Sequence, residues 1–362
     1  MKKLAIRILI IFLIFYSVVL PQSGAMDLFN TSRYARAIRL GNAYTGVAEG
    51  TETLFYNTAG IANLNSYSVL VSQGQGFGIF TEDVKAYDYA IIIPLFNNYG
   101  TIGVSANTLT DKFIQGRDGF YIYTINYARN LADDISVGIA ANYYYLKFSN
   151  LTTSSSPDET KSISGSAIDI NLAVLYRFPE SFTFSSNDKF QVGFQIKNIL
   201  NTKIKYDNFP QEDYKFQNIR AGFSYNYNPN FEKVFGLSPL KFMFAFDAVF
   251  KGADYDFTEW QPNFGIELTL FEILQLSFGR ENEIQIKEIY SYSPQHPVNR
   301  YGAGIKIPFH KFFDLSNRLE LKFDYCISDW QKIDEDNVQP APFWNIKKID
   351  KKAFSLGLTL NF

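Results

Sequence analysis

Cysteine and histidine are nearly missing from this chain of 362 residues, which holds one Cys and two His. A single cysteine, Cys326, excludes a disulfide framework and is better explained as a small buried filler than as a reactive thiol. The sequence also lacks paired metal-ligand spacing, a nucleophile elbow and a Gly-rich phosphate loop. We therefore predict that the protein is not an enzyme and uses no metal or cofactor.

Long hydrophobic runs are missing beyond residue 26, so no transmembrane helix is expected there. Ahead of that point, three basic residues, an apolar run over 8–20 and small residues at 23–25 form the pattern of a secretory signal. A membrane anchor is the alternative, but the run is shorter than the roughly 20 residues that a spanning helix needs. We predict a signal peptide over 1–25, cleaved near Ala25, and an outer-membrane location in a diderm bacterium.

An excess of positive charge is missing as well. The formal net charge is -2, and removing the three basic residues of the signal makes it -5. The remaining charges are spread along the chain, which argues against a nucleic-acid partner.

Aromatic residues are plentiful, with 35 Phe and 24 Tyr, and the chain alternates in polarity over many short segments. Residues 353–362 alternate without exception, with the apolar residues at the even positions. Alternation alone fits both a soluble β-sandwich and a membrane barrel. Fourteen such segments are predicted: 66–80, 86–96, 99–109, 119–129, 134–149, 165–178, 188–199, 214–227, 239–250, 260–269, 273–280, 298–308, 317–328 and 353–362.

The layout of these segments decides for the barrel. Long and short connections alternate, with Asn97-Asn98 as a tight inner turn and 329–352 as the longest outer loop. A sandwich predicts no such alternation. We predict an all-β fold, a transmembrane antiparallel barrel of about fourteen strands over 66–362, with His296 in an outer loop and His310 in an inner turn.

With the apolar faces toward lipid, the lumen receives charged residues of both signs. A salt-bridged polar filling is the plainer interpretation, and a selectivity lining for a pore is the alternative. The predicted lumen residues are Lys197, Arg220, Asp247, Glu267, Lys306, Glu320, Lys322 and Asp324.

Residues 26–65 do not alternate, yet they are too apolar for a free tail. We predict that they form a plug or hatch against the barrel interior. In the first strand, Gly74, Gly76 and Gly78 share one face, which leaves bare backbone that the plug could approach closely. A ligand on this strip is the less economical alternative.

The plug segment carries a family resemblance. The runs ARAIRLGNAYTGVA (35–48) and LFYNTAGIA (54–62) resemble the opening motif of PorV/PorQ-type outer-membrane proteins, within a larger FadL-like group. Thr58 departs from this pattern, because the family usually has proline there. The matching motif residues are Arg36, Gly41, Asn42, Tyr44, Thr45, Tyr56, Asn57 and Gly60.

The resemblance implies a fourteen-stranded barrel with an N-terminal hatch, and a terminal aromatic, Phe362, that the barrel assembly machinery recognises. It also implies an accessory role in type IX protein secretion, with secretion-system proteins and exported cargo as partners. Passive transport of long-chain fatty acids or other hydrophobic compounds, as in the FadL branch, is the alternative. Outer-membrane lipid and lipopolysaccharide are expected to surround the barrel.

Overall fold

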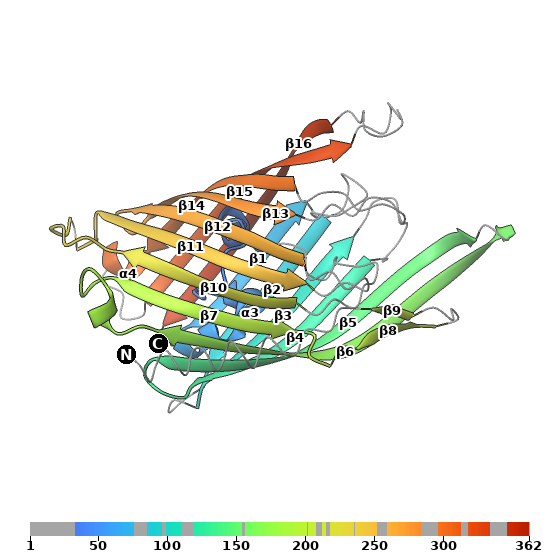
Figure 1. The fold of residues 1–362 in the computed structure, drawn as a ribbon, viewed down its shortest axis with the longest axis horizontal. Coiled ribbons are helices and arrows are strands. Elements are labelled where there is room, and N and C mark those ends of the chain that lie inside the picture. Colours follow the sequence, from blue (N-terminus) through green and yellow to red (C-terminus); the bar gives the residue numbers. More distant parts are fainter. Residues whose placement is uncertain are drawn as a thin grey trace.

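Fourteen long antiparallel strands close into a barrel (Figure 1). Neighbouring strands along the chain pair with one another, β1 pairs with β16, and pairing between β5 and β6 completes the circle. This confirms the predicted fold class and strand number. The computed structural model describes residues 33–75, 85–95, 99–110, 119–153, 156–200, 202–207, 212–214, 218–234, 236–251, 259–283, 296–312, 318–333 and 346–361.

Several predictions fall outside these ranges: the signal peptide, Gly76, Gly78, the Asn97-Asn98 turn and Phe362. The barrel strands are β1 (Tyr67–Gln75), β2 (Lys85–Pro94), β3 (Thr101–Thr110), β4 (Gly119–Asn130), β5 (Ile135–Thr153), β6 (Ser156–Arg177), β7 (Lys189–Lys197), β10 (Asn218–Tyr227), β11 (Leu240–Lys251), β12 (Glu259–Leu270), β13 (Leu274–Glu283), β14 (His296–Pro308), β15 (Arg318–Ile333) and β16 (Ile346–Asn361).

A small hairpin was not predicted. Strands β8 (Lys203–Tyr206) and β9 (Glu212–Tyr214) lie in the connection between β7 and β10, and β8 pairs with β6. The helices are short: α2 (Ala35–Arg39), α3 (Thr53–Tyr56), η2 (Thr58–Asn63), η4 (Glu180–Phe182) and α4 (Phe309–Phe312). Among the described residues, no helix has the length and apolarity to cross a membrane.

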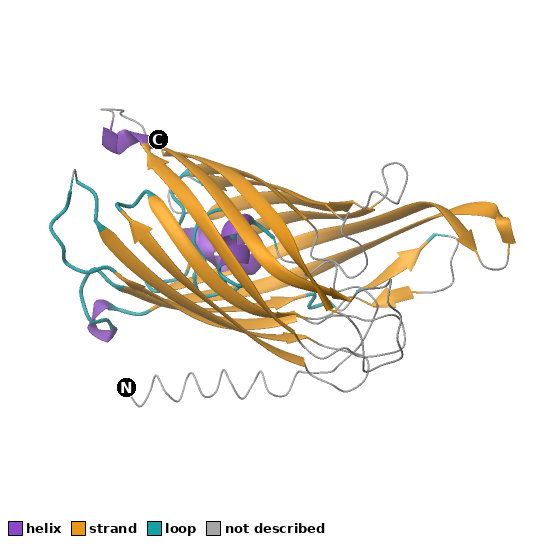
Figure 2. Cartoon of the chain, turned by 90° about the horizontal axis from the view of Figure 1, so that it is seen from above, coloured by secondary structure: helices purple, strands orange, loops and turns teal. Residues whose placement is uncertain are grey.

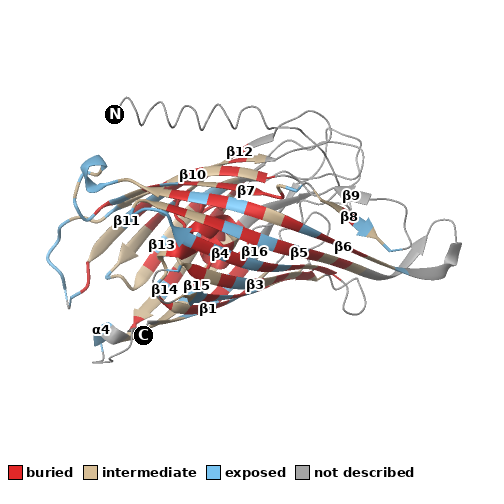
Figure 3. Cartoon of the chain, turned by 90° about the horizontal axis from the view of Figure 1, so that it is seen from below, coloured by how far each residue is buried: buried red, intermediate tan, exposed pale blue. Residues whose placement is uncertain are grey.

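Side chains alternate between the two faces of the wall, as Figure 3 shows. In β4, Ile122, Thr124 and Asn126 are buried inward, whereas Ile125 is 64% exposed on the outer face. The alternation follows from the pleat of a strand, which directs successive side chains to opposite faces. An apolar outer face and a polar inner face are the arrangement that a lipid-embedded barrel requires.

The barrel has two different ends. The "turn end" carries the connections 131–134 and 271–273 and the start of β1, and the "loop end" is the opposite one. The predicted bounds of the outer loop, 329–352, were wrong, because β15 continues to Ile333 and β16 starts at Ile346. His296 likewise begins β14 rather than lying in a loop. Backbone pairing outlasts the apolar pattern because the ladder continues into water after lipid contact has ended.

Candidate functional site

Residues 33–65, the "N-terminal segment", lie among the strands rather than beside them (Figure 2). Nearly every residue from 33 to 48 is buried. The short helices α2, α3 and η2 contact strands from both halves of the barrel, including β4, β5 and β15. The segment therefore meets the inward face of the wall on several sides.

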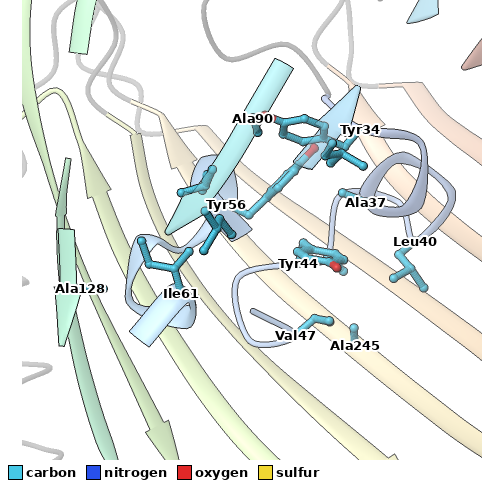
Figure 4. Packing of buried hydrophobic residues seen from close by; sticks show 14 of the residues in the cluster. Tyr34, Ala37, Leu40, Tyr44, Val47, Tyr56, Ile61, Ala90, Ala128 and Ala245 are labelled. Atoms are coloured by element: carbon cyan, nitrogen blue, oxygen red, sulfur yellow. The ribbon is translucent and has the colours of Figure 1, made fainter. Parts of the chain in front are cut away.

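An apolar cluster joins the segment to the wall (Figure 4). Tyr34, Leu40 and Tyr56 are almost fully buried, and they gather with small wall residues such as Ala90 and Ala245. Small side chains on the wall leave room for the large ones of the segment. Burial of a side chain of this size contributes about 1.5–3 kcal/mol, so the cluster holds the segment in place.

Inward glycines let the two backbones approach closely. A Cβ at Gly265 of β12 would lie 2.5 Å from the Leu40 carbonyl oxygen, and one at Gly138 of β5 would lie 2.6 Å from the Ala59 nitrogen. Gly193 of β7 meets the Thr45 carbonyl in the same way. Only glycine leaves space for these contacts. The predicted strip behaves differently, because Gly74 lies against Ala353 and not against the segment.

Three buried arginines of the segment face carboxylates of the wall. Arg33 is paired with Asp88 at 3.1 Å, and Arg36 with Glu267 at 3.0 Å. Arg39, which is fully buried, reaches both Glu267 at 3.0 Å and Asp324 at 2.9 Å. Buried charges are stable only when they are paired and hydrogen-bonded, so each pair fixes one point of the segment against one strand.

Asp247 of β11 binds the segment through its backbone. It accepts hydrogen bonds from the Tyr44 N–H at 3.1 Å and from the Thr45 hydroxyl at 2.6 Å. Arg220 of β10 lies 2.9 Å from the same carboxylate and also donates to the Asn42 carbonyl oxygen, 2.5 Å away. Asp247 and Arg220, both predicted for the lumen, thus act as one clamp on the segment.

The motif residues hold the segment in its own shape. Gly41 has a φ of 64°, which favours glycine, and Asn42 follows with a φ of 58°. The Tyr56 hydroxyl lies 2.7 Å from Asn42 Oδ1, and burial raises the pKa of this hydroxyl, which stays a donor. Asn57 donates to the Thr45 carbonyl oxygen at 2.8 Å and accepts from the Ala59 N–H, which caps η2.

Most of the other predicted motif and lumen residues also contact the segment or lie within it. A Cβ at Gly60 would lie 2.5 Å from the Ala48 carbonyl oxygen. Lys322 pairs with Glu52 of the segment, and Lys197 lies 3.4 Å from the centre of the Phe55 ring. Thr58, where the family usually has proline, donates a hydrogen bond to Asn126. Lys306 and Glu320 pair with each other at 2.9 Å, away from the segment.

Sequence reasoning missed several residues of this site, among them Arg33, Arg39 and Asp88. Arg39 lies within the motif run 35–48 and Arg33 just before it, so their charge was visible in the sequence but their partners were not. The inward glycines Gly193 and Gly265 had a usable signal, because each interrupts an alternating strand at an inward position.

The site offers binding contacts rather than reactive groups. The part of the chain with described side chains holds no cluster of three or more His, Cys, Asp or Glu that would bind a metal. A cavity of about 420 Å³ lies where the segment meets the β6–β7 connection, lined by Ala48, Glu49, Leu64 and Arg177 among others. The segment is therefore approachable from the turn end.

Comparison with known families adds a second line of evidence. The family model "Type IX secretion system protein PorV" matches residues 90–237. The predicted resemblance to PorV is confirmed. The match covers wall strands from β2 to β10, outside the opening motif, so the resemblance does not rest on that motif alone. No curated protein sequence matches the chain.

Solved barrels are similar in fold at low identity. The CymD monoaromatic hydrocarbon channel shares 9% identity over 93% of this chain and 99% of its own, with a TM-score of 0.50. A FadL homologue from Pseudomonas aeruginosa shares 9% identity over 94% of this chain and 100% of its own, with a TM-score of 0.47. The Ralstonia pickettii toluene transporter TbuX shares 8% identity over 91% of this chain and 98% of its own, with a TM-score of 0.48. The likeness to CymD supports the barrel fold alone.

Proposed function

We propose that this protein is an outer-membrane accessory component of type IX protein secretion. The PorV family match over residues 90–237 carries this proposal. The closed barrel with an apolar outer face supports the outer-membrane location. Its partners are then secretion-system proteins and exported cargo, and its role is non-enzymatic.

The N-terminal segment serves, in this proposal, as a plug over residues 26–65. Its described part makes apolar, glycine-backbone and charged contacts with the wall, as set out above. A plug held by several buried ion pairs stays in place during normal function, because separating any pair exposes two unpaired charges to a low-dielectric interior. The wall is then a closed scaffold, and partners bind at its ends or outer surface.

Uptake of hydrophobic compounds is the competing function. The FadL-type barrels share this fold, but a likeness at 8–9% identity does not identify a substrate for this chain. Many inward side chains are buried amides and acids, such as Asn107, Asn142 and Gln195. These polar groups are already buried, so an apolar solute would have to displace them or their partners, and it could not hydrogen-bond with them. The inward face thus favours the export role.

Deleting the gene tests the proposal. Proteomics of the secreted and periplasmic fractions of the deletion strain and its parent would show selective loss of secreted proteins and their accumulation in the periplasm. Complementation with the full chain should restore secretion. An unchanged secretome, with normal amounts of the protein in the outer membrane of the parent, would contradict the export role and leave hydrophobic uptake as the better proposal.

A further inference from the structure

A groove runs along the outer face of β2, β3, β4, β5 and β6. It encloses about 550 Å³ and is lined almost entirely by apolar groups. Tyr89, Tyr123 and Tyr143 form its ridges, Ala106 lies between Tyr89 and Tyr123, and Ala141 lies beside Ile125, one outward position from Tyr143 toward the turn end. The Tyr123 and Tyr143 rings stack at 6.4 Å. The groove is thus a shaped recess in the apolar outer face of the wall.

Strand register places a second row of aromatic residues next to the groove, toward the loop end. Tyr87 pairs with Thr108, Thr108 with Tyr121, and Tyr121 with Tyr145. The Tyr121 and Tyr145 rings lie 5.9 Å apart. Tyrosine combines an apolar ring with a polar tip, which suits the boundary between lipid tails and headgroups.

Lysines follow one step further toward the loop end. Lys85 occupies the outward position next to Tyr87 on β2, and Lys147 the one next to Tyr145 on β5. A third lysine, Lys205 of β8, is exposed and pairs in register with Ser166 of β6, which places it in the row of Tyr145 and not beyond that row. No ion pair joins any of these three lysines to a residue with a described side chain. Asp207 lies nearby and accepts a hydrogen bond from Ser164 at 2.7 Å.

We propose that this wall binds a lipid of the leaflet at the loop end that carries two phosphates, one on Lys85 and one on Lys147, with one acyl chain in the groove; the two lysines lie three strand spacings, about 14 Å, apart. Lys147 follows Tyr143 by four positions, which is about 13 Å along the strand. This span fits a headgroup above a tail, and lysine side chains extend toward the water while their stems cover the tyrosine rings. The positive charge complements a phosphate and gives a neutral lipid no advantage.

The opposite wall carries a comparable groove. It encloses about 470 Å³ on β10–β13 and has a similar apolar lining, with Tyr227, Phe242 and Phe278. No lysine is among the lining residues of either groove, and the exposed Arg280 follows Phe278 toward the loop end, so this groove is flanked by one described cation where the first is flanked by two lysines. The proposal requires that the barrel span a membrane, and it is independent of the export role.

The test is native mass spectrometry of the full chain in detergent, titrated with bisphosphorylated lipid A and with its dephosphorylated form. The variant Lys85→Ser/Lys147→Ser should bind lipid A about ten- to thirtyfold more weakly, since each lysine near a lipid surface contributes about 1 kcal/mol. The matched control Lys189→Ser/Lys233→Ser removes two exposed lysines at the turn end and should bind like the wild type.

A second pair of variants tests the groove. Ala141→Phe fills it and should weaken binding of lipid A, whereas Ala303→Phe, at an outward position of β14, should not. Equal binding by the two lysine variants, or equal binding of the dephosphorylated lipid, would overturn the proposal. So would a dimer that Ala141→Phe abolishes, because a second copy would then occupy the groove. None of these results would alter the secretome of the deletion strain, so the two proposals fail separately.

Discussion

Replacing Gly265 with alanine should loosen the N-terminal segment without breaking the barrel. The new Cβ would lie 2.5 Å from the Leu40 carbonyl oxygen and 2.9 Å from its carbon, against 3.4 Å for ordinary contact. The segment must therefore move by about 1 Å at this point. Overpacking of this kind costs about 1–3 kcal/mol. The substitution destabilises the docked state of the segment and not the strand pairing, because the atoms nearest the new Cβ all belong to Leu40 of the segment.

Trypsin provides the assay, because Arg36 and Arg39 are buried only while the segment is docked. If cleavage proceeds through an open state in rapid exchange, 1–3 kcal/mol raises its rate about 5- to 150-fold. Mass spectrometry of the detergent-solubilised protein would count peptides that end at these two arginines. Circular dichroism would verify that the barrel content is unchanged.

Gly74→Ala is the matched control. Gly74 also faces inward, but a Cβ there would meet only Ala353 at 3.3 Å and its neighbours on β16. Its cleavage rate should match that of the wild type. If the two alanine variants are cleaved equally fast, or if the wild type is already cut at Arg39 as fast as an unfolded chain, the docked arrangement of the segment is refuted.

Three further predictions concern the same contacts and the turn end. Asp247→Ala leaves Arg220 buried without its carboxylate and should destabilise the protein by about 3–5 kcal/mol in urea titration, whereas Asp247→Asn should cost clearly less; equal costs would contradict the clamp. Asn57→Ala removes the η2 cap and the bond to Thr45 and should cost about 1–3 kcal/mol, whereas exposed Asn187→Ala should cost under about 0.5 kcal/mol. Burial raises the pKa of Glu272, but hydrogen bonds from Lys311 and Lys241 outweigh this effect and lower the pKa from 4.5 to about 2. The ionised Glu272 therefore stabilises the folded protein at neutral pH, and this stabilisation is lost as the pH falls from 4.5 toward 2. Between pH 4.5 and 2, the urea midpoint of unfolding should fall less steeply in Glu272→Gln than in the wild type, and an equally steep fall would exclude this contribution.

The strands could be predicted because lipid and lumen impose opposite polarity on successive residues. Segment 353–362 shows this alternation without exception, and its residues 353–361 lie in β16. The ends of the strands could not be predicted in the same way. Asp329 pairs with Asp350 where the ladder of β15 and β16 continues, and the sequences there, DWQKI (329–333) and IKKID (346–350), have no regular alternation that would mark a strand. The β8–β9 hairpin is too short to show a period.

The sequence by itself determined that the chain alternates as barrel strands do and that its N-terminal segment is too apolar to be free. The tertiary structure decided where that segment binds. Arg36 meets Glu267, 231 residues away, and Thr45 meets Asp247, 202 residues away. Such partners depend on barrel closure and on the register of every intervening strand pair, and a slip of one residue would turn these carboxylates toward lipid. Local patterns specify which residues form strands, but only the closed barrel brings distant strands to one segment.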